Sequence, residues 1–186
     1  MTPGRPPGPP EGAEIDAGSE PVTGGPDRSD AGADTDAVAA LLGRRPAGAF
    51  TVVVRDRSGA PAVIENAPLL SDGTPMPTRW WLVSAVLREM VSRLESTGGV
   101  RAAEAAVDPS RLAEAHRRYA AERDGALPPD HRGPRPSGGV GGTRQGVKCL
   151  HAHLAWWLAG GDDPVGDWVA GRLGVDRGDF VQTGAP

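Results

Sequence analysis

The segment DHRGPRPSGGVGGTRQGVKCLHAHLAWWLAG, residues 130–160, is the stretch around which the rest of the chain is organised. It begins as a loop rich in Pro, Gly and Arg and continues as an apolar run that holds the only cysteine and the only lysine of the chain, Cys149 and Lys148. Thr143 follows four glycines and can cap a helix. We therefore predict a helix from Arg144 to Ala159, preceded by a flexible glycine-rich loop.

Outward from this segment, the remaining patterns predict a mixed fold. Residues 49–55 and 61–66 are rich in β-branched side chains and flank a Ser-Gly turn, which is typical of a hairpin. Helical spacing predicts helices at about 36–43, 81–97 and 108–123, and Pro164 after two aspartates predicts another from residue 164. The expected class is α+β, with a small β-hairpin or sheet packed against four or five helices.

The ends of the chain differ from its middle. Residues 1–34 contain seven Pro, seven Gly and seven acidic side chains against two arginines, with almost nothing large and apolar. Such a segment buries too little surface to offset its chain entropy, so we predict a disordered acidic tail. We expect a single globular domain over 36–175 and a frayed C-terminus over 176–186.

Composition excludes several classes of protein. There is no apolar run long enough to span a membrane, and the first residues lack the apolar core of a signal peptide. One cysteine makes no internal disulfide, which favours a cytoplasmic protein. Residues 117–148 carry seven basic against three acidic side chains, a patch too modest for a nucleic-acid protein and better suited to a small anionic ligand.

The leading hypothesis is therefore a binding site for a phosphorylated or otherwise anionic small molecule at the glycine-rich loop. Free amides at a helix N-terminus favour an anion there, and nearby cations add to this. The sequence is not a Walker motif, because Cys149 follows Lys148 where Ser or Thr is required. The predicted ligand-binding residues are Arg135, Gly138, Gly139, Gly141, Gly142, Thr143, Arg144 and Lys148, with Glu65 and Asn66 on the opposite wall.

Cysteine and histidine offer two further hypotheses. In a helix only Cys149 and His153 share a face, so His151 should turn away. Two ligands are too few for structural zinc unless His116 or His131 joins them, and we predict no metal. Alternatively, Cys149 near a helix N-terminus is a nucleophile, which makes the protein a Cys/His-dependent hydrolase or transferase. The catalytic candidates are Cys149, His131, His151 and His153; whether the protein is an enzyme, and with which cofactor, stays open.

The segments VVVR (52–55), PAVIENAPLLSDGTPMPT (61–78), AHRRYAAERD (115–124) and HRGPRPSGGVGGTRQGVKCLHAHLAWWLAGGDDPVG (131–166) resemble a family found mainly in high-GC Gram-positive bacteria, domain-of-unknown-function family 501. The resemblance implies no activity. Neighbouring genes in that family imply phosphate chemistry or a protein partner in cell division. A third hypothesis is therefore a cell-division-associated interaction protein. Many relatives carry cysteines where this chain has Asp56 and Ser84, and with the cysteine that matches Cys149 these imply a metal or cluster site. Asp56 could still serve as a ligand, whereas Ser84 is a poor one, so whether the site persists in this chain stays open.

Overall fold

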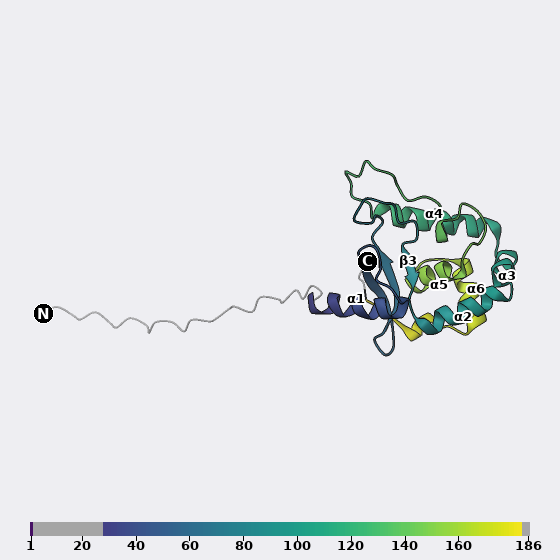
Figure 1. Cartoon of the computed structure of the whole chain (residues 1–186), viewed down its shortest axis with the longest axis horizontal. Helices are drawn as coiled ribbons and strands as arrows, with labels where there is room; N and C mark the ends of the chain where they lie inside the picture. The colour runs from purple at the N-terminus through teal and green to yellow at the C-terminus, as the bar shows by residue number, and fades with distance from the viewer. Residues whose placement is uncertain (2–27, 184–186) are drawn as a thin grey trace.

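A four-stranded antiparallel sheet forms the middle layer of the protein (Figure 1). The computed structural model describes residues 28–183 together with Met1. Within that range the strands run in the order β3-β2-β1-β4 across the sheet. Their bounds are Phe50–Asp56 (β1), Pro61–Asn66 (β2), Trp80–Leu82 (β3) and Phe180–Gln182 (β4). The predicted α+β class is confirmed.

The β1–β2 hairpin is held by its turn residues. Gly59 has a φ of 87°, which L-residues rarely adopt. Asp56 accepts hydrogen bonds from the backbone amides of Ser58, at 2.9 Å, and Ala60, at 3.0 Å. The hydrogen bond from the Ser58 hydroxyl, together with those from the backbone amides, lowers the pKa of the Asp56 carboxyl below its ordinary value. The predicted hairpin is therefore present, and Asp56 is used to close it.

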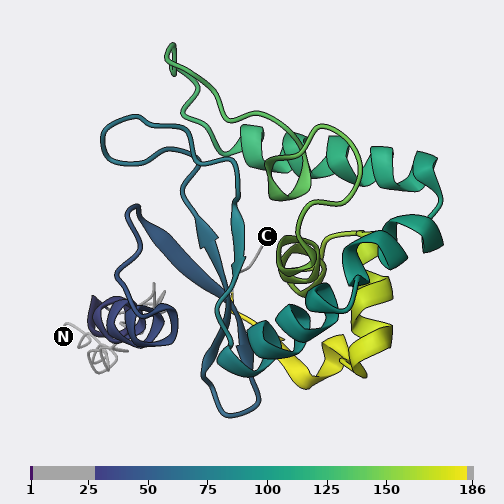
Figure 2. The same ribbon diagram turned by 45° about the vertical axis from the view of Figure 1, so that its right-hand side comes forward.

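Six helices occur in the described residues, where the sequence predicted four or five. They lie on both faces of the sheet: α1 covers one face, and the remaining helices cover the other (Figure 2). No helix among them is long and apolar enough to cross a membrane. Their bounds are Arg28–Leu42 (α1), Ala85–Ser96 (α2), Gly99–Ala106 (α3), Pro109–Gly125 (α4), Leu150–Leu158 (α5) and Pro164–Leu173 (α6).

Helix α5 is the centre of the larger of two hydrophobic cores. Seven of its nine residues are buried, and it packs against α6, β3 and α2. Trp156 in this helix is 1% exposed and packs against the rings of Trp80 and Tyr119. The smaller core lies between α1 and the other sheet face and consists of Val38, Val52, Ile64 and Val83 with partly buried neighbours. Burial of each large apolar side chain contributes about 1.5–3 kcal/mol.

Trp80–Leu82 corrects one prediction. The helical spacing placed these residues in a helix, but they form strand β3, with Trp81 opposite Ile64 of β2. Helix α2 begins only after Ser84, whose side chain accepts a hydrogen bond from the amide of Leu87. The sequence pattern of residues 80–82 is compatible with either a helix or a strand. Hydrogen bonds with the neighbouring strand β2 decide in favour of the strand.

The two ends of the described chain also differ from expectation. Asp34, placed in the predicted disordered tail, lies in α1 and forms an ion pair of 2.7 Å with Arg55 of β1. Residues 2–27 of that tail lie outside the described residues. At the C-terminal end, residues 180–182 pair with β1 and are not frayed. Both segments are therefore ordered by contacts with residues that are distant in the sequence.

Candidate functional site

The glycine segment, residues 138–146, is a compact loop and not the beginning of a helix. The amide of Gly139 donates to the carbonyl of Thr143 at 2.7 Å, and the amide of Gly142 donates to the carbonyl of Gly139 at 3.0 Å. The amide of Val140 donates to Nδ1 of His116 at 3.0 Å. These three amides, which the sequence assigned to an anion, are bonded within the protein.

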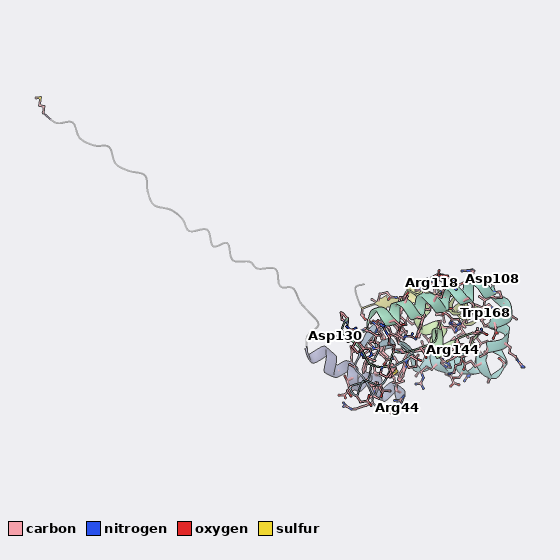
Figure 3. The ribbon with its side chains drawn as sticks, turned by 90° about the horizontal axis from the view of Figure 1, so that it is seen from above. Arg44, Asp108, Arg118, Asp130, Arg144 and Trp168 are labelled. Carbon is pink, nitrogen blue, oxygen red and sulfur yellow. The ribbon has the colours of Figure 1, made fainter. Side chains whose placement is uncertain are left out.

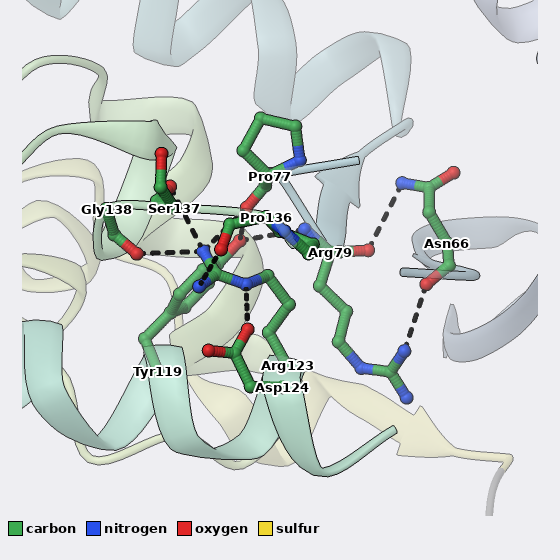
Figure 4. Close-up of polar contacts among 9 residues, drawn as sticks. All are labelled: Asn66, Pro77, Arg79, Tyr119, Arg123, Asp124, Pro136, Ser137 and Gly138. Atoms are coloured by element: carbon green, nitrogen blue, oxygen red, sulfur yellow. Dashed lines mark hydrogen bonds and ion pairs between the residues drawn. The ribbon is translucent and has the colours of Figure 1, made fainter. Parts of the chain in front are cut away.

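Arg123 of α4 anchors the start of this loop (Figure 4). Its side chain is 1% exposed, and its guanidinium donates to the carbonyls of Pro136, Ser137 and Gly138, the last at 2.8 Å. A further donation reaches the carbonyl of Pro77 at 3.5 Å. An arginine has five donors in a fixed planar arrangement, which suits several carbonyls at once. One buried cation therefore joins α4 to two loops that are far apart in sequence.

Helix α5 begins at Leu150, six residues later than predicted. Gly146 has a φ of 65° and Cys149 is extended, so the segment before Leu150 is not helical. Glu95 at the end of α2 accepts the amide of Leu150 at 2.7 Å, and Glu104 accepts the amide of Val147 at 3.3 Å. A helix N-terminus favours negative charge nearby. Here the protein itself supplies that charge, through the carboxylates of Glu95 and Glu104.

Of the predicted anion-binding residues, Gly138, Gly139 and Arg144 line one cavity, and the others lie outside its lining. Arg144 lines a cavity of about 800 Å³ between α4 and the glycine segment, but Arg135 and Lys148 are exposed and lie outside its lining. Asp130 and Arg144 lie well apart in Figure 3, so the loop that joins them runs a long way over the surface. Glu65 and Asn66 line a separate depression beside Arg79 and do not face the glycines. The predicted set therefore does not line one pocket as a whole, although a cavity does lie beside Gly138, Gly139 and Arg144.

Instead, Cys149, His151 and Glu95 form a cluster at the start of α5. Cys149 Sγ lies 3.7 Å from His151 Nδ1, and Glu95 Oε1 lies 3.3 Å from the same nitrogen. The prediction that Cys149 shares a face with His153 and not with His151 is wrong. It assumed helical geometry at Cys149, whereas the extended backbone there turns the thiol toward His151.

Hydrogen bonding fixes which nitrogen of His151 carries a proton. Nε2 lies 3.1 Å from the backbone carbonyl of Arg88, which only accepts, and 3.3 Å from the Ser92 hydroxyl, which can donate or accept. The carbonyl therefore assigns a hydrogen to Nε2. Nδ1 then faces the thiol and a carboxylate oxygen that also only accepts. The hydrogen bond with Cys149 and the negative charge of Glu95 raise the pKa of His151 above its ordinary value, although partial burial opposes this. Nδ1 therefore lies between the thiol of Cys149 and the carboxylate of Glu95.

The cluster opens into a cavity of about 660 Å³ between β3, α2 and α5. One wall is apolar, with Trp80, Trp81 and Leu82 of β3. Arg88 and Ser92 of α2 supply polar groups on another side. The side chains of His151 and Glu95 are each about a quarter exposed, 25% and 27%, so a small molecule in the cavity can reach the cluster.

The other two candidate histidines have structural partners. His153 is fully buried, and its Nδ1 lies 2.7 Å from Oδ2 of Asp163. His131 Nε2 lies 3.0 Å from the carbonyl oxygen of Pro134 in the same loop. The structure thus brings together Cys149 and His151 of the four catalytic candidates and leaves His131 and His153 elsewhere.

Glu95 was not predicted from the sequence. It lies 54 residues before Cys149 and resembles any acidic residue at the end of an amphipathic helix. The only signal is that Arg88, Ser92 and Glu95 share one face of α2 at spacings of four and three. A polar face on a helix is ordinarily solvated, so this spacing alone does not identify a site.

His116 gives a testable pH dependence. Burial is the main cause that lowers the pKa of His116 below its ordinary value of about 6.5, although a hydrogen bond to Gly146 opposes it. Protonation of Nδ1 would also break the bond from Val140. The stability contributed by neutral His116 is therefore complete above about pH 6.5 and is lost as the pH falls toward the folded-state pKa. We expect the difference in unfolding free energy between the wild type and His116→Gln to shrink between about pH 7.5 and about pH 5, measured by urea unfolding. A constant difference would contradict this.

Comparison with known proteins places the chain in a family. The family described as "Protein of unknown function (DUF501)" matches residues 52–171. The chain belongs to this family. The DUF501 match contains the whole cluster and the glycine segment, whereas α1 and β4 lie outside it. No curated protein and no solved structure matches the sequence significantly.

The two positions at which the DUF501 resemblance implied a metal are used for structure in this chain. Asp56 closes the β1–β2 turn, and Ser84 caps α2. Among the described residues, the group of side chains whose donor atoms approach closely enough for a metal is Glu95, Cys149 and His151. The ligands implied by the DUF501 resemblance and those offered by the structure therefore share Cys149 alone.

Proposed function

We propose that this protein is a thiol-dependent hydrolase or transferase, with Cys149 as nucleophile and His151 as general base and acid. The observation that carries the proposal is the meeting of Cys149 Sγ, His151 Nδ1 and Glu95 Oε1, with Cys149 and His151 lining a cavity. A nucleophile, a base within reach of its proton, and a third group that orients the base are the components of nucleophilic catalysis.

Each residue has a defined step in this reaction. His151 Nδ1 takes the thiol proton, and the thiolate attacks the carbonyl carbon of an acyl substrate. The resulting tetrahedral intermediate collapses to a thioester on Cys149, and the leaving group departs with the proton from Nδ1. Water or another acceptor then gives its proton to Nδ1 and attacks the thioester, which releases the acyl group and restores the thiol. Glu95 stabilises the protonated ring between these steps.

The cavity supports an acyl group with an apolar or aromatic body. Trp80 and Trp81 present aromatic surface, and Ala152 lies beside the thiol on the first turn of α5. Aromatic walls bind such groups through burial and stacking. Arg88 lies on the polar side, where it suits a carboxylate or a carbonyl oxygen of the substrate.

Alkylation tests the activation of Cys149 directly, because the chain has one cysteine and every modified thiol is Cys149. We expect iodoacetamide to modify the native protein at about pH 6.5 at least about tenfold faster than a free cysteine derivative, since thiolate reacts and thiol does not. His151→Gln should remove most of this advantage. Mass spectrometry of samples quenched over time gives the rate.

His131→Gln is the matched control, because it makes the same substitution at a histidine outside the cluster. Its alkylation rate should equal that of the wild type. With p-nitrophenyl esters of short and aromatic acids, the wild type should release a burst of one nitrophenol per chain, and Cys149→Ala should release none. Equal alkylation rates for the wild type and His151→Gln would refute the proposal.

A further inference from the structure

The three side chains of the cluster also have the geometry of a metal site. Zinc lies about 2.0 Å from carboxylate oxygen, 2.1 Å from imidazole nitrogen and 2.3 Å from thiolate sulfur. A tetrahedral arrangement with these lengths separates sulfur from nitrogen by roughly 3.6 Å and nitrogen from oxygen by roughly 3.4 Å. The corresponding distances are 3.7 Å between Cys149 Sγ and His151 Nδ1 and 3.3 Å between His151 Nδ1 and Glu95 Oε1.

We propose that Glu95, Cys149 and His151 bind one Zn²⁺ ion and that this ion switches off the thiol chemistry. The zinc site itself does not depend on the proposed function. Only the claim that zinc switches off the thiol chemistry rests on it. A thiolate that ligates zinc gives its lone pair to the metal and no longer attacks a substrate. The ion would then act as a reversible inhibitor, bound to the same three side chains that form the reactive centre.

Groups around the cluster already orient two of the three ligands, His151 and Glu95. His151 Nε2 donates to the carbonyl of Arg88, which leaves Nδ1 as the nitrogen that faces the other two ligands. The amide of Leu150 donates to Glu95 Oε1 and fixes that carboxylate. Metal-binding histidines almost always donate their second nitrogen in this way, and such partners are needed for tight binding. These two donors are therefore arranged before any metal arrives.

The ligand types select zinc over the hard cations. Mg²⁺ and Ca²⁺ prefer oxygen ligands, whereas a set of one sulfur, one nitrogen and one oxygen suits Zn²⁺. A thiolate and a carboxylate together carry the two negative charges that a divalent ion balances. Three protein ligands leave the fourth position facing the cavity, so the ion can enter and leave through the opening that a substrate would use.

Zinc protection of Cys149 tests the inference. The protein, carrying no histidine tag and treated with EDTA, is titrated with ZnSO₄ and then alkylated with iodoacetamide. We expect one ion per chain and a fall of at least about tenfold in the alkylation rate at saturation, reversed by EDTA. Co²⁺ in place of Zn²⁺ should give the thiolate-to-metal charge-transfer absorption that a sulfur ligand produces.

Glu95→Gln and Glu89→Gln form a matched pair of variants. Both residues lie on α2 and lose the same charge, but Glu89 pairs with Arg93, lines another part of the cavity wall and is outside the cluster. The amide oxygen that Glu95→Gln introduces still accepts the amide of Leu150, so the helix start is preserved. Glu95→Gln should weaken zinc binding at least about tenfold, and Glu89→Gln should leave it unchanged. Equal losses in both variants would overturn the site.

The two proposals fail separately. If zinc at saturation leaves the alkylation rate unchanged, the zinc site is refuted, whereas a rate that still depends on His151 keeps the thiol function. If zinc protects Cys149 but the wild type and His151→Gln are alkylated equally fast without metal, the zinc site stands and the thiol function falls. Faster ester cleavage by the zinc-loaded protein would refute the inhibitory role.

Discussion

Replacement of Arg123 by alanine should lower the free energy of unfolding by about 3–5 kcal/mol. The side chain is 1% exposed, and its guanidinium donates to backbone carbonyls at Pro77, Pro136, Ser137 and Gly138. Alanine leaves the carbonyls of Pro136, Ser137 and Gly138 without this donor, whereas Pro77 keeps its contact with the Tyr119 hydroxyl. The substitution also opens a cavity. For a chain of this length, we expect the midpoint of thermal unfolding to fall by roughly 10 °C.

Arg117→Ala is the control, since Arg117 lies on the same helix but is exposed and pairs with Glu114 at the surface. Arg117→Ala should lower the free energy of unfolding by no more than about 0.5 kcal/mol. A second readout locates the damage: trypsin should cut after Arg132 or Arg144 faster in Arg123→Ala than in the wild type, because the loop has lost its anchor. Similar stability and similar cleavage rates in the two variants would show that Arg123 does not hold the loop.

Elements whose signals are local were predictable from the sequence. Helices α4 and α6 each begin at an Asp-Pro pair, in which aspartate caps the free amides and proline occupies a position that needs no donor. The β1–β2 hairpin likewise depends on its own turn. Residues within one turn of each other determine these structures, so the sequence pattern contains the cause.

Elements that depend on distant partners were not predictable. Trp80–Leu82 becomes a strand because β2 lies beside it, and α5 starts late because Gly146 interrupts the backbone and Glu95 caps Leu150. The candidate site fails to appear in the sequence for the same reason. Its chemistry depends on an extended backbone at Cys149 and on a carboxylate from another helix, and neither has a local signature.

Asp163→Ala should lower the free energy of unfolding by about 3–5 kcal/mol. Asp163 Oδ1 accepts the amides of Val165 and Gly166 at the start of α6, and Oδ2 lies 2.7 Å from Nδ1 of His153. The side chains of both Asp163 and His153 are 0% exposed. Alanine removes the helix cap and also leaves a buried imidazole N–H without an acceptor, so two losses combine.

Asp108→Ala separates these two losses. Asp108 also precedes a proline and caps α4 by accepting the amide of Arg111 at 2.9 Å, but it is exposed and has no buried histidine partner. Its replacement should cost about 1 kcal/mol, the value of a cap alone. Asp163→Asn should fall between the two, because asparagine keeps the cap acceptor and loses the carboxylate that pairs with His153. Urea unfolding of the three variants measures the order, and equal costs for the two alanine variants would show that the buried His153 contact adds nothing to the cap.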